Sequence, residues 1–328
     1  MSKTICITCG EPAGIGPEII EKALAQYQGN ARFIILGDKT HFNNSFLKII
    51  DHEVSSLADA DYVSDKKFIF CHIPFSGTVQ LSHPSADYAK DILNIIEIAT
   101  IYCCDDPKHR AMVTAPVQKE NLAQYDPEFR GHTDFIAEHI HKIYGTYFQP
   151  VMMLSAPDLK VVPLSVHIPI QKVPEYVTQQ NIIKSVQIIA NDLKQKYKMN
   201  DPHIAIAGLN PHAGDGGIIG DEDQNIIKPA IEILKKDYHV TGPYAADTMF
   251  HPEARKSYDL ALCMYHDQAL IPIKTIAFDI GINVTLGLPI IRTSPDHGTA
   301  LNIAGENRAN PSSMLAAIYE AERVLAYL

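Results

Sequence analysis

Residues 259–305 read DLALCMYHDQALIPIKTIAFDIGINVTLGLPIIRTSPDHGTALNIAG. Two short apolar runs, at residues 260–265 and 288–291, are predicted to be buried strands. Seven polar or ionisable side chains lie between or beside them: His266, Asp267, Lys274, Asn283, Arg292, Asp296 and His297. Such groups are costly beside core strands unless they bind a ligand. His266 and Arg292 directly follow the runs, where open α/β sheets bind their ligands, so the stretch is predicted to form half of an active site.

Strands and helices alternate along the rest of the chain. Further strands are predicted at residues 4–8, 32–36, 111–114, 161–166 and 204–209, and helices at 17–27, 87–99, 135–143, 181–197, 226–234 and 310–325. This order is typical of a mainly parallel sheet covered by helices, an α/β fold. A length of 328 residues with 46% hydrophobic content suggests two lobes. Residues 43–85 are irregular, and no structure is predicted for them.

Composition limits the partners and the compartment. The formal charge is −10 and there is no Lys/Arg-rich run, which argues against nucleic acid and membrane surfaces as partners. No apolar segment approaches the roughly 18 residues of a membrane span, and the first residues lack a signal-peptide layout, so a cytoplasmic protein is expected. The six cysteines lack the spacing of a disulfide framework. Cys6 and Cys9 are interpreted as core thiols.

Three histidines follow the ends of predicted buried strands: His167, His212 and His266. Neighbouring parallel strands would bring these ends to one edge of the sheet. Three imidazoles with an open position are the ligand set of a catalytic divalent-metal site, and histidine ligation favours zinc or cobalt over magnesium or manganese. Any one of them alone is better explained as a hydrogen-bonded core histidine. Asp247 and Asp267 either orient the imidazoles, touch the metal or are turn residues.

Lys274, Asn283 and Arg292 are candidates to hold an anionic substrate, because Arg offers a planar fork to carboxylate or phosphate and Lys a point charge. Two glycine loops, GEPAGIG at residues 10–16 and NPHAGDGG at residues 210–217, follow strands and could turn backbone N–H groups toward an anion. Such glycines are equally common in tight turns. Neither loop fits the Rossmann or P-loop pattern, so a dinucleotide would bind another way.

SPDHGTALNIAGENRANP, at residues 294–311, resembles the cofactor loop of the metal-dependent isocitrate and isopropylmalate dehydrogenases, which bind NAD or NADP without a Rossmann fold. Further motifs resemble the 4-hydroxythreonine-4-phosphate dehydrogenase family of vitamin B6 biosynthesis: GEPAGIGPEI, TAPVQKENL, GHTDF, SVHIP, LNPHAGDGG, GPYAADTMF, MYHDQALIPIK and GINVTLGLPIIRTSPDHGTAL. The resemblance is collinear and covers residues 10–311.

The resemblance implies a two-lobed α/β/α fold with the active site in the cleft between the lobes. One lobe would comprise residues 1–130 and 290–328 and carry the cofactor loop. The other, residues 131–289, would carry the metal ligands and the interface of a homodimer.

The resemblance also implies a role for particular residues. His167 and His212 would bind one divalent metal together with His266 of the second subunit. The substrate would contact His132, Thr133, Lys274, Asn283 and Arg292. The cofactor, NAD or NADP, would contact Asp296, His297, Gly298, Thr299 and Asn302. The candidates for catalytic roles are Lys274, Asp247 and Asp267, with Lys274 or Asp247 taking the hydroxyl proton.

The implied reaction oxidises the C3 hydroxyl of 4-phosphooxy-L-threonine and releases its carboxylate as CO2. The sequence departs from the family pattern at Asp134, where Glu is expected, around Gln118, and between residues 43 and 85. A dehydrogenase for 4-phosphoerythronate or a similar acid would keep the same motifs. A phosphate acyltransferase of similar fold would need no three-histidine site, and the cofactor loop argues against a non-catalytic metal-binding protein.

Overall fold

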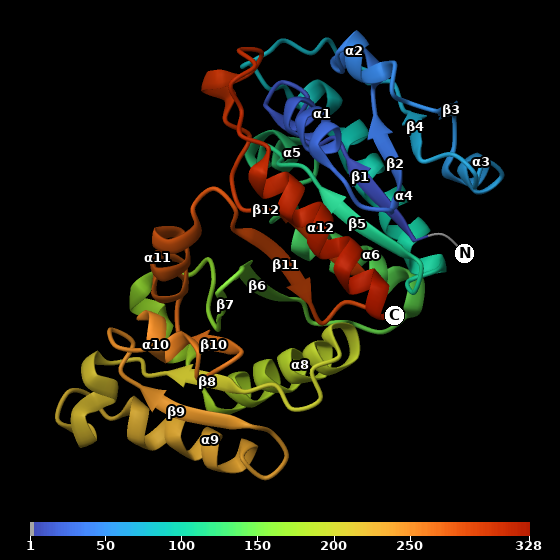
Figure 1. Ribbon diagram of the computed structural model, residues 1–328. Helices are drawn as coiled ribbons and strands as arrows, with labels where there is room; N and C mark the ends of the chain where they lie inside the picture. Colours follow the sequence, from blue (N-terminus) through green and yellow to red (C-terminus); the bar gives the residue numbers. More distant parts are fainter. Residues whose placement is uncertain (1–2) are drawn as a thin grey trace. The chain divides into compact units, whose positions relative to one another are not determined.

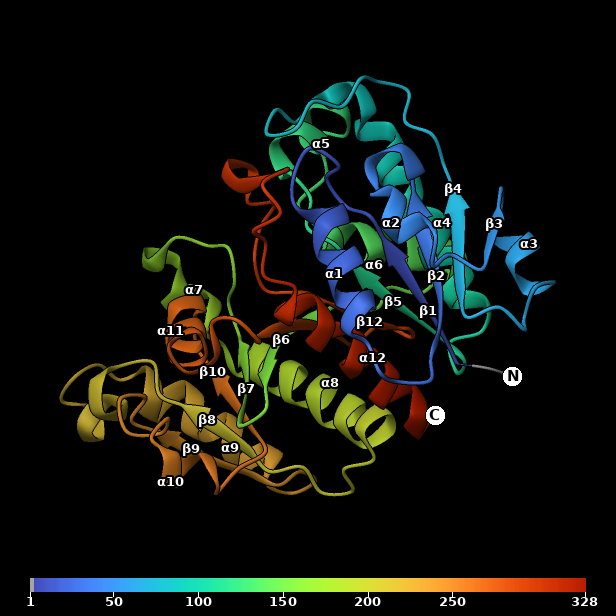
Figure 2. The same cartoon turned by 45° about the horizontal axis from the view of Figure 1, so that its top comes forward.

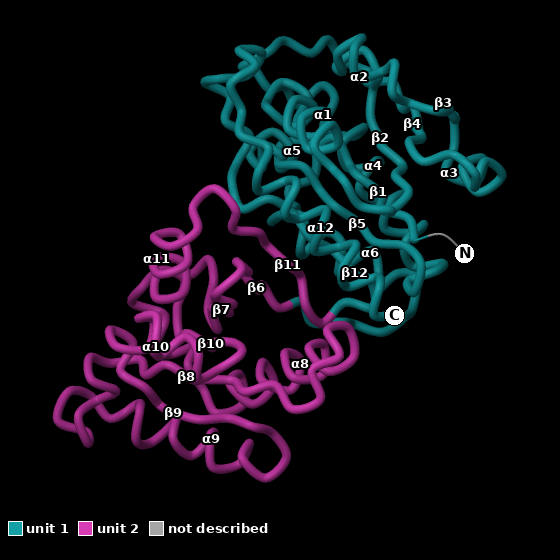
Figure 3. Tube along the Cα trace, viewed as in Figure 1, with its two compact units in different colours: residues 1–150, 288–328 teal, residues 151–287 magenta. Residues whose placement is uncertain are grey.

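The computed structural model describes residues 3–328 and divides the chain into two compact units (Figures 1 and 3). Unit 1 comprises the residues up to Pro150 together with Leu288–Leu328, and unit 2 comprises Val151–Gly287. The expected lobe boundary after residue 130 differs from this division by twenty residues. Residues 131–150 belong to unit 1 because helix α6 (His132–Tyr144) packs against α4 (Ala89–Asp105).

Unit 1 is built on six strands in the order β3-β4-β2-β1-β5-β12, and every neighbouring pair is parallel. The strands are β1 (Thr4–Thr8), β2 (Arg32–Gly37), β3 (His52–Val54), β4 (Phe68–His72), β5 (Arg110–Thr114) and β12 (Ile291–Pro295). The remaining helices are α1 (Gly16–Gln26), α2 (Asn44–Leu47), α3 (Leu57–Asp61), α5 (Lys119–Tyr125) and α12 (Ser312–Tyr327). The prediction of a mainly parallel α/β fold is confirmed.

Helices cover both faces of the unit 1 sheet. Helices α1 and α12 lie side by side over β1, β5 and β12 (Figures 1 and 2), and Thr293 of β12 donates to the Ala317 carbonyl of α12 at 2.8 Å. Side chains alternate between faces along a strand, so the neighbouring Arg292 points to the other face. That face is covered by α4, with α6 packed against α4. Strands β1, β2 and β4, which are buried on both faces, are rich in Ile and Phe.

Unit 2 has the strand order β11-β6-β7-β10-β8-β9. β6 pairs antiparallel with both β11 and β7, whereas β7, β10, β8 and β9 are parallel neighbours. The strands are β6 (Val151–Ala156), β7 (Leu159–Pro163), β8 (Ile204–Ala207), β9 (Val240–Tyr244), β10 (Leu260–Cys263) and β11 (Ile282–Leu286). The helices are α7 (Val173–Tyr176), α8 (Gln179–Tyr197), α9 (Lys228–Leu234), α10 (Pro252–Arg255) and α11 (His266–Ala277).

The six cysteines are all free and buried, and the interpretation of Cys6 and Cys9 as core thiols is confirmed. Within residues 3–328, no helix is long and apolar enough to cross a membrane.

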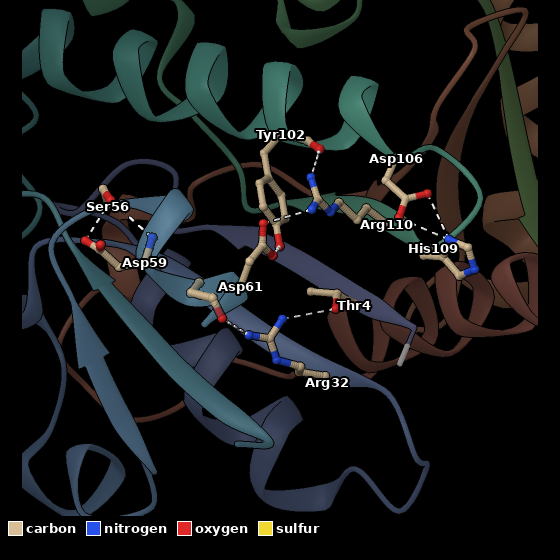
Figure 4. A network of polar contacts seen from close by, with 10 residues as sticks. Thr4, Arg32, Ser56, Asp59, Asp61, Tyr102, Asp106, His109 and Arg110 are labelled. Atoms are coloured by element: carbon tan, nitrogen blue, oxygen red, sulfur yellow. Dashed lines mark hydrogen bonds and ion pairs between the residues drawn. The ribbon is translucent and has the colours of Figure 1, made fainter. Parts of the chain in front are cut away.

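A polar network at the amino ends of β1, β2 and β5 ties α3 to α4 (Figure 4). Asp61, the last residue of α3, accepts hydrogen bonds from the Tyr102 hydroxyl at 2.6 Å and from Arg110 Nη2 at 3.0 Å. The Arg110 guanidinium carbon lies 3.7 Å from the centroid of the Tyr102 ring. Arg32 donates to the Ala60 carbonyl of α3. The network fixes the short helix α3, which lies in the segment that sequence periodicity left unassigned.

We expect Tyr102→Phe to lower the free energy of unfolding by about 1 kcal/mol, because it removes a hydrogen bond to a half-exposed carboxylate. Urea unfolding followed by circular dichroism measures the change. Tyr62→Phe is the matched control, since Tyr62 is exposed and no bond of its hydroxyl supports the network. Equal stabilities for the two variants would show that the network does not hold α3.

Candidate active site

The loops that follow β1, β5 and β12 meet at the carboxyl edge of the unit 1 sheet, because these strands are parallel neighbours. Backbone hydrogen bonds join them. Glu11 N–H donates to the Pro116 carbonyl at 2.8 Å, and Ile15 N–H donates to the Thr299 carbonyl at 3.0 Å. The motifs GEPAGIG, TAPVQK and SPDHGTAL are therefore joined to one another at this edge of the unit 1 sheet.

Arg292 lies inside β12 and is 4% exposed. The prediction of a strand at residues 288–291 that ends before Arg292 is wrong. The strand begins at Ile291, after Pro289, which cannot donate to a sheet ladder. Arg292 pairs in register with Met112 of β5, and its Nη2 donates to Thr114 Oγ1 at 2.7 Å. Burial lowers the pKa of Arg292 to about 10.

His132 is the first residue of the 13-residue helix α6, and Thr133 follows it. His132 Nε2 is buried and finds no hydrogen-bond partner within residues 3–328. Burial, together with the charges of Arg292 and Lys119, holds the pKa of His132 well below its usual value. A carbon atom added to Gly131 would lie 3.7 Å from Lys119 Nζ. Two cations and a helix amino terminus therefore lie around a neutral imidazole, a setting that favours an anion.

The expected cofactor contacts lie on the loop that follows β12: Asp296, His297, Gly298, Thr299 and Asn302. Thr299 is buried, and its hydroxyl donates to Gln118 Oε1 at 3.3 Å. Gly298 and Asn302 are exposed. A carbon atom added to Gly298 would meet no atom of residues 3–328 within 4 Å, so the backbone there is open to a ligand.

In unit 2 the carboxyl ends of β7, β10 and β8 lie side by side, so the expectation that parallel neighbours precede the three histidines is confirmed. His167 follows β7, and His266 opens α11 after β10. Their ring centroids are 6.1 Å apart. Both line a cavity of about 220 Å³ together with Ser165, Ile170, Tyr265 and Asp267. His266 Nδ1 lies 2.7 Å from Asp267 Oδ1.

His212 is exposed in the NPHAGDGG loop, where residues 212–216 all have positive φ. The buried carboxylate of Asp223 holds the start of this loop by accepting Leu209 N–H at 2.9 Å and Asn210 N–H at 3.1 Å. In the part of the chain that is described, no three His, Cys, Asp or Glu side chains gather closely enough to hold a metal. One chain therefore brings His167 to His266 but leaves His212 apart.

The remaining candidates occupy separate positions on unit 2. Lys274 lies two turns after His266 on α11, with Nζ 5.9 Å from the centroid of the Phe278 ring. Asn283 is half-buried on β11, and its Oδ1 has no hydrogen-bond partner among the residues described. Asp247 is exposed in the turn after β9.

Thr114 and Lys119 are site residues that the sequence patterns do not single out, although both lie in the motif TAPVQKENL. They flank the carboxyl end of β5, next to the strand that carries Arg292. A search for a polar residue just after a buried strand, the rule that singled out the three histidines, does not reach them, because Thr114 is the last residue of β5 and Lys119 begins α5 five residues later.

The family model described as "Pyridoxal phosphate biosynthetic protein PdxA" matches residues 29–321. The chain belongs to this family. The resemblance to the 4-hydroxythreonine-4-phosphate dehydrogenase family of vitamin B6 biosynthesis, proposed from the motifs, is confirmed by this match and by the relatives that follow.

Named relatives agree over nearly the whole length. A 4-hydroxythreonine-4-phosphate dehydrogenase of Bradyrhizobium diazoefficiens is 42% identical, covering 99% of this chain and 98% of its own. One of Ruegeria sp. is 41% identical, covering 98% and 96%. The crystal structure of the Klebsiella pneumoniae 4-hydroxythreonine-4-phosphate dehydrogenase has a TM-score of 0.83 at 31% identity, covering 99% of this chain and 98% of that one.

We expect His132 to stay neutral from about pH 6 to pH 8, because its pKa is held well below the usual value of about 6.5. NMR of ¹⁵N-histidine-labelled protein, with the signal assigned by His132→Asn, measures this. In Lys119→Ala the pKa of His132 should rise, since one like charge is lost. Lys142→Ala, at the far end of α6, is the control and should leave it unchanged. A midpoint near 6.5 in the unaltered protein would contradict the prediction.

Proposed function

We propose that this chain is a 4-hydroxythreonine-4-phosphate dehydrogenase that oxidises the C3 hydroxyl of 4-phosphooxy-L-threonine with NAD or NADP. Loss of the carboxylate as CO2 then gives 3-amino-2-oxopropyl phosphate, in vitamin B6 biosynthesis in the cytoplasm. The observation that supports the proposal most is the sequence identity of 41% and 42%, over nearly the whole chain, to two relatives of that name. The cationic group of unit 1 fits the phosphorylated substrate that the name requires.

The substrate's phosphate or carboxylate is assigned to the group formed by Arg292, Lys119 and His132. Arg292 offers a planar fork, already oriented by Thr114, and Lys119 adds a second positive charge. His132, being neutral, donates a single hydrogen bond. Thr133 on α6, with Lys274 and Asn283 of unit 2, completes the proposed substrate contacts. The buried amide oxygen of Asn283 is suited to a donor such as the substrate's amino group.

His167, His212 and His266 are the proposed ligands of one divalent metal. The donor chemistry fits, since zinc–nitrogen bonds are about 2.0–2.1 Å and two rings 6.1 Å apart can reach one ion. Asp267 accepts from His266 Nδ1, so Nε2 is left as the electron-pair donor. His212 can bind the same ion only if it comes from a second subunit or if its loop moves. Histidine ligation favours zinc or cobalt over magnesium or manganese.

Residues Asp296, His297, Gly298, Thr299 and Asn302 are the proposed binding loop for NAD or NADP. Gly298 lets a ligand approach the backbone closely, and the exposed Asn302 amide can hydrogen-bond it. A nicotinamide held by this loop would supply a hydride acceptor, and a metal held by the three histidines would supply Lewis-acid polarisation of the substrate oxygen. Lys274 or Asp247 is proposed to take the hydroxyl proton, and Asp267 to orient His266.

A homodimer is part of the proposal. Large apolar side chains of unit 2 are strongly exposed near His167, on the His212 loop and on α11: Ile170 at 66%, Ile218 at 84%, Ile271 at 64% and Phe278 at 75%. A second copy would cover such a surface. The family resemblance implies that His167 and His212 of one site come from one subunit and His266 from its partner. In the structure, by contrast, His167 lies near His266 of the same chain. In either arrangement His212 and His266 of one site come from different subunits.

The test is NAD(P)H formation measured at 340 nm with 4-phosphooxy-L-threonine and, separately, with 4-phosphoerythronate. We expect turnover of the threonine derivative, loss of turnover with a chelator, and recovery with zinc or cobalt. Alanine at His167, His212 or His266 should remove the metal and the activity without unfolding the protein. Preference for 4-phosphoerythronate would replace the proposed substrate, and chelator-resistant turnover would exclude the metal.

Arg292→Ala should lower kcat/KM by roughly ten- to a hundredfold, because it removes a charge-assisted hydrogen bond to the bound anion. Lys119→Ala should produce a smaller loss that disappears at high salt, since an exposed ammonium acts mainly through its charge. Lys142→Ala is the control for a lost surface charge. Unchanged kinetics for Arg292→Ala would show that the anion is held elsewhere.

Mixing inactive His212→Ala and His266→Ala subunits tests the shared site. If the two histidines come from different subunits, one site of each heterodimer carries both lesions and the other carries none. Activity should then return, to at most half of the sites in each heterodimer. If all three ligands come from one chain, every site keeps a lesion and no activity returns.

A further inference from the structure

The proposed nucleotide-binding loop, residues 296–302, rests against the β1–α1 loop, residues 10–16. Ile15 N–H donates to the Thr299 carbonyl at 3.0 Å. A carbon atom added to Gly14 would lie 2.7 Å from the same carbonyl oxygen and 3.1 Å from Thr299 Cβ, closer than side-chain carbons come to other atoms. Glycine at position 14 is therefore required for this approach.

Ser82 bridges the same two loops from the other side. Its N–H donates to the Ala13 carbonyl at 2.8 Å, and its hydroxyl donates to the Leu301 carbonyl at 2.7 Å. Ser82 has φ 66°, a left-handed conformation that costs energy for a residue other than glycine. Ser82 is thus held in place at a conformational cost, with its N–H bonded to one loop and its hydroxyl to the other.

Glu11 fixes the β1–α1 loop from within the protein. It is fully buried, and its Oε1 accepts Ala13 N–H at 3.0 Å and the Tyr88 hydroxyl at 2.8 Å. The Tyr88 oxygen accepts Ser85 N–H at 2.9 Å, so one carboxylate organises both the β1–α1 loop and the segment that carries Ser82.

Helix α1 holds the far end of the same region. Glu18 accepts Ala309 N–H at 2.7 Å, and Lys22 donates to the carbonyls of Asn307 at 2.9 Å and Ala309 at 3.1 Å. A salt bridge of 2.7 Å joins Glu18 to Lys22. The chain from residue 299 to residue 309 is therefore tied to the β1–α1 segment at both ends.

We propose that Glu11, Gly14 and Ser82, the loop clamp, are positioning residues that hold the nucleotide-binding loop in its binding conformation and so set the affinity for the nicotinamide cofactor. The inference rests on the proposed function, which assigns the cofactor to residues 296–302. A loop that is ordered before binding loses less conformational entropy on binding, so loosening it weakens the nucleotide without changing any group that touches it.

The experiment compares Gly14→Ala and Ser82→Ala with the unaltered protein. NADH and NADPH binding is titrated by fluorescence without substrate, and KM is measured separately for the nucleotide and for 4-phosphooxy-L-threonine. For whichever nucleotide binds, we expect Kd and KM to rise about tenfold in Gly14→Ala, where backbone must move. In Ser82→Ala, which loses one hydrogen bond, they should rise about two- to tenfold. The substrate KM and kcat should change less than about twofold.

Ser76→Ala is the matched control, because its hydroxyl bonds to Asp91 of α4 and not to the loop. It should bind nucleotide normally. If Gly14→Ala does not fold, nucleotide binding by Ser82→Ala alone tests the inference. Normal nucleotide binding in the folded variants overturns the inference. So does an equal rise in the KM for the nucleotide and the KM for 4-phosphooxy-L-threonine. The inference also fails if the unaltered protein binds neither nucleotide. If the variants bind nucleotide more weakly but the unaltered protein does not turn over 4-phosphooxy-L-threonine, the proposed function is wrong and the inference about the loop clamp still holds.

Discussion

A guanidinium group buried in the interior of a parallel sheet is the constraint around which unit 1 is arranged. Arg292 lies within β12 with 4% of its surface exposed, where an ionised group loses most of its hydration. The hydroxyl of Thr114 is a neutral partner at 2.7 Å, while Lys119 adds charge of the same sign and His132 stays neutral beside it. An anion bound there would interact favourably with both cations at once. The position of the proposed anion site thus follows from the register of β12 beside β5.

Buried carboxylates organise the polar loops in both units. Glu11 accepts the Ala13 N–H of the loop after β1, and Asp223 accepts the Leu209 and Asn210 N–H groups of the loop after β8. A carboxylate can accept several N–H groups without donating, which suits loops whose amides face inward. Burial raises the pKa of Glu11, and the bonds from Ala13 and Tyr88 oppose that rise.

The sequence predicts the α/β fold and the positions of His167 and His266, because strand ends can be recognised from short apolar runs and parallel strands end at one edge. It fails for Arg292, since the run LPII at residues 288–291 looks like a strand although Pro289 delays the start of β12. For His212 the sequence predicts only that the residue follows a strand, and not where its side chain points. The left-handed run from residue 212 to 216 turns that side chain to solvent, and composition does not encode such a path.

Residues 43–85 show no recognisable sequence pattern for a different reason. Helices α2 and α3 and strand β3 have three to five residues each, too few for a periodic pattern. The side chains that secure α3 come from distant parts of the chain, such as Arg32, Tyr102 and Arg110, and their convergence is visible only in the fold (Figure 4). Local sequence carries little information about a helix that is held by remote partners.

The buried thiols have a practical consequence for redox chemistry and labelling. Burial raises the pKa of both Cys9 and Cys71 to about 12, so neither forms an appreciable amount of the reactive thiolate near neutral pH. All six cysteines are buried, which shields the native chain from alkylating reagents and from oxidative crosslinking. A single cysteine introduced on an exposed surface would therefore carry a fluorophore or spin label selectively, because the buried native cysteines would not react with the labelling reagent.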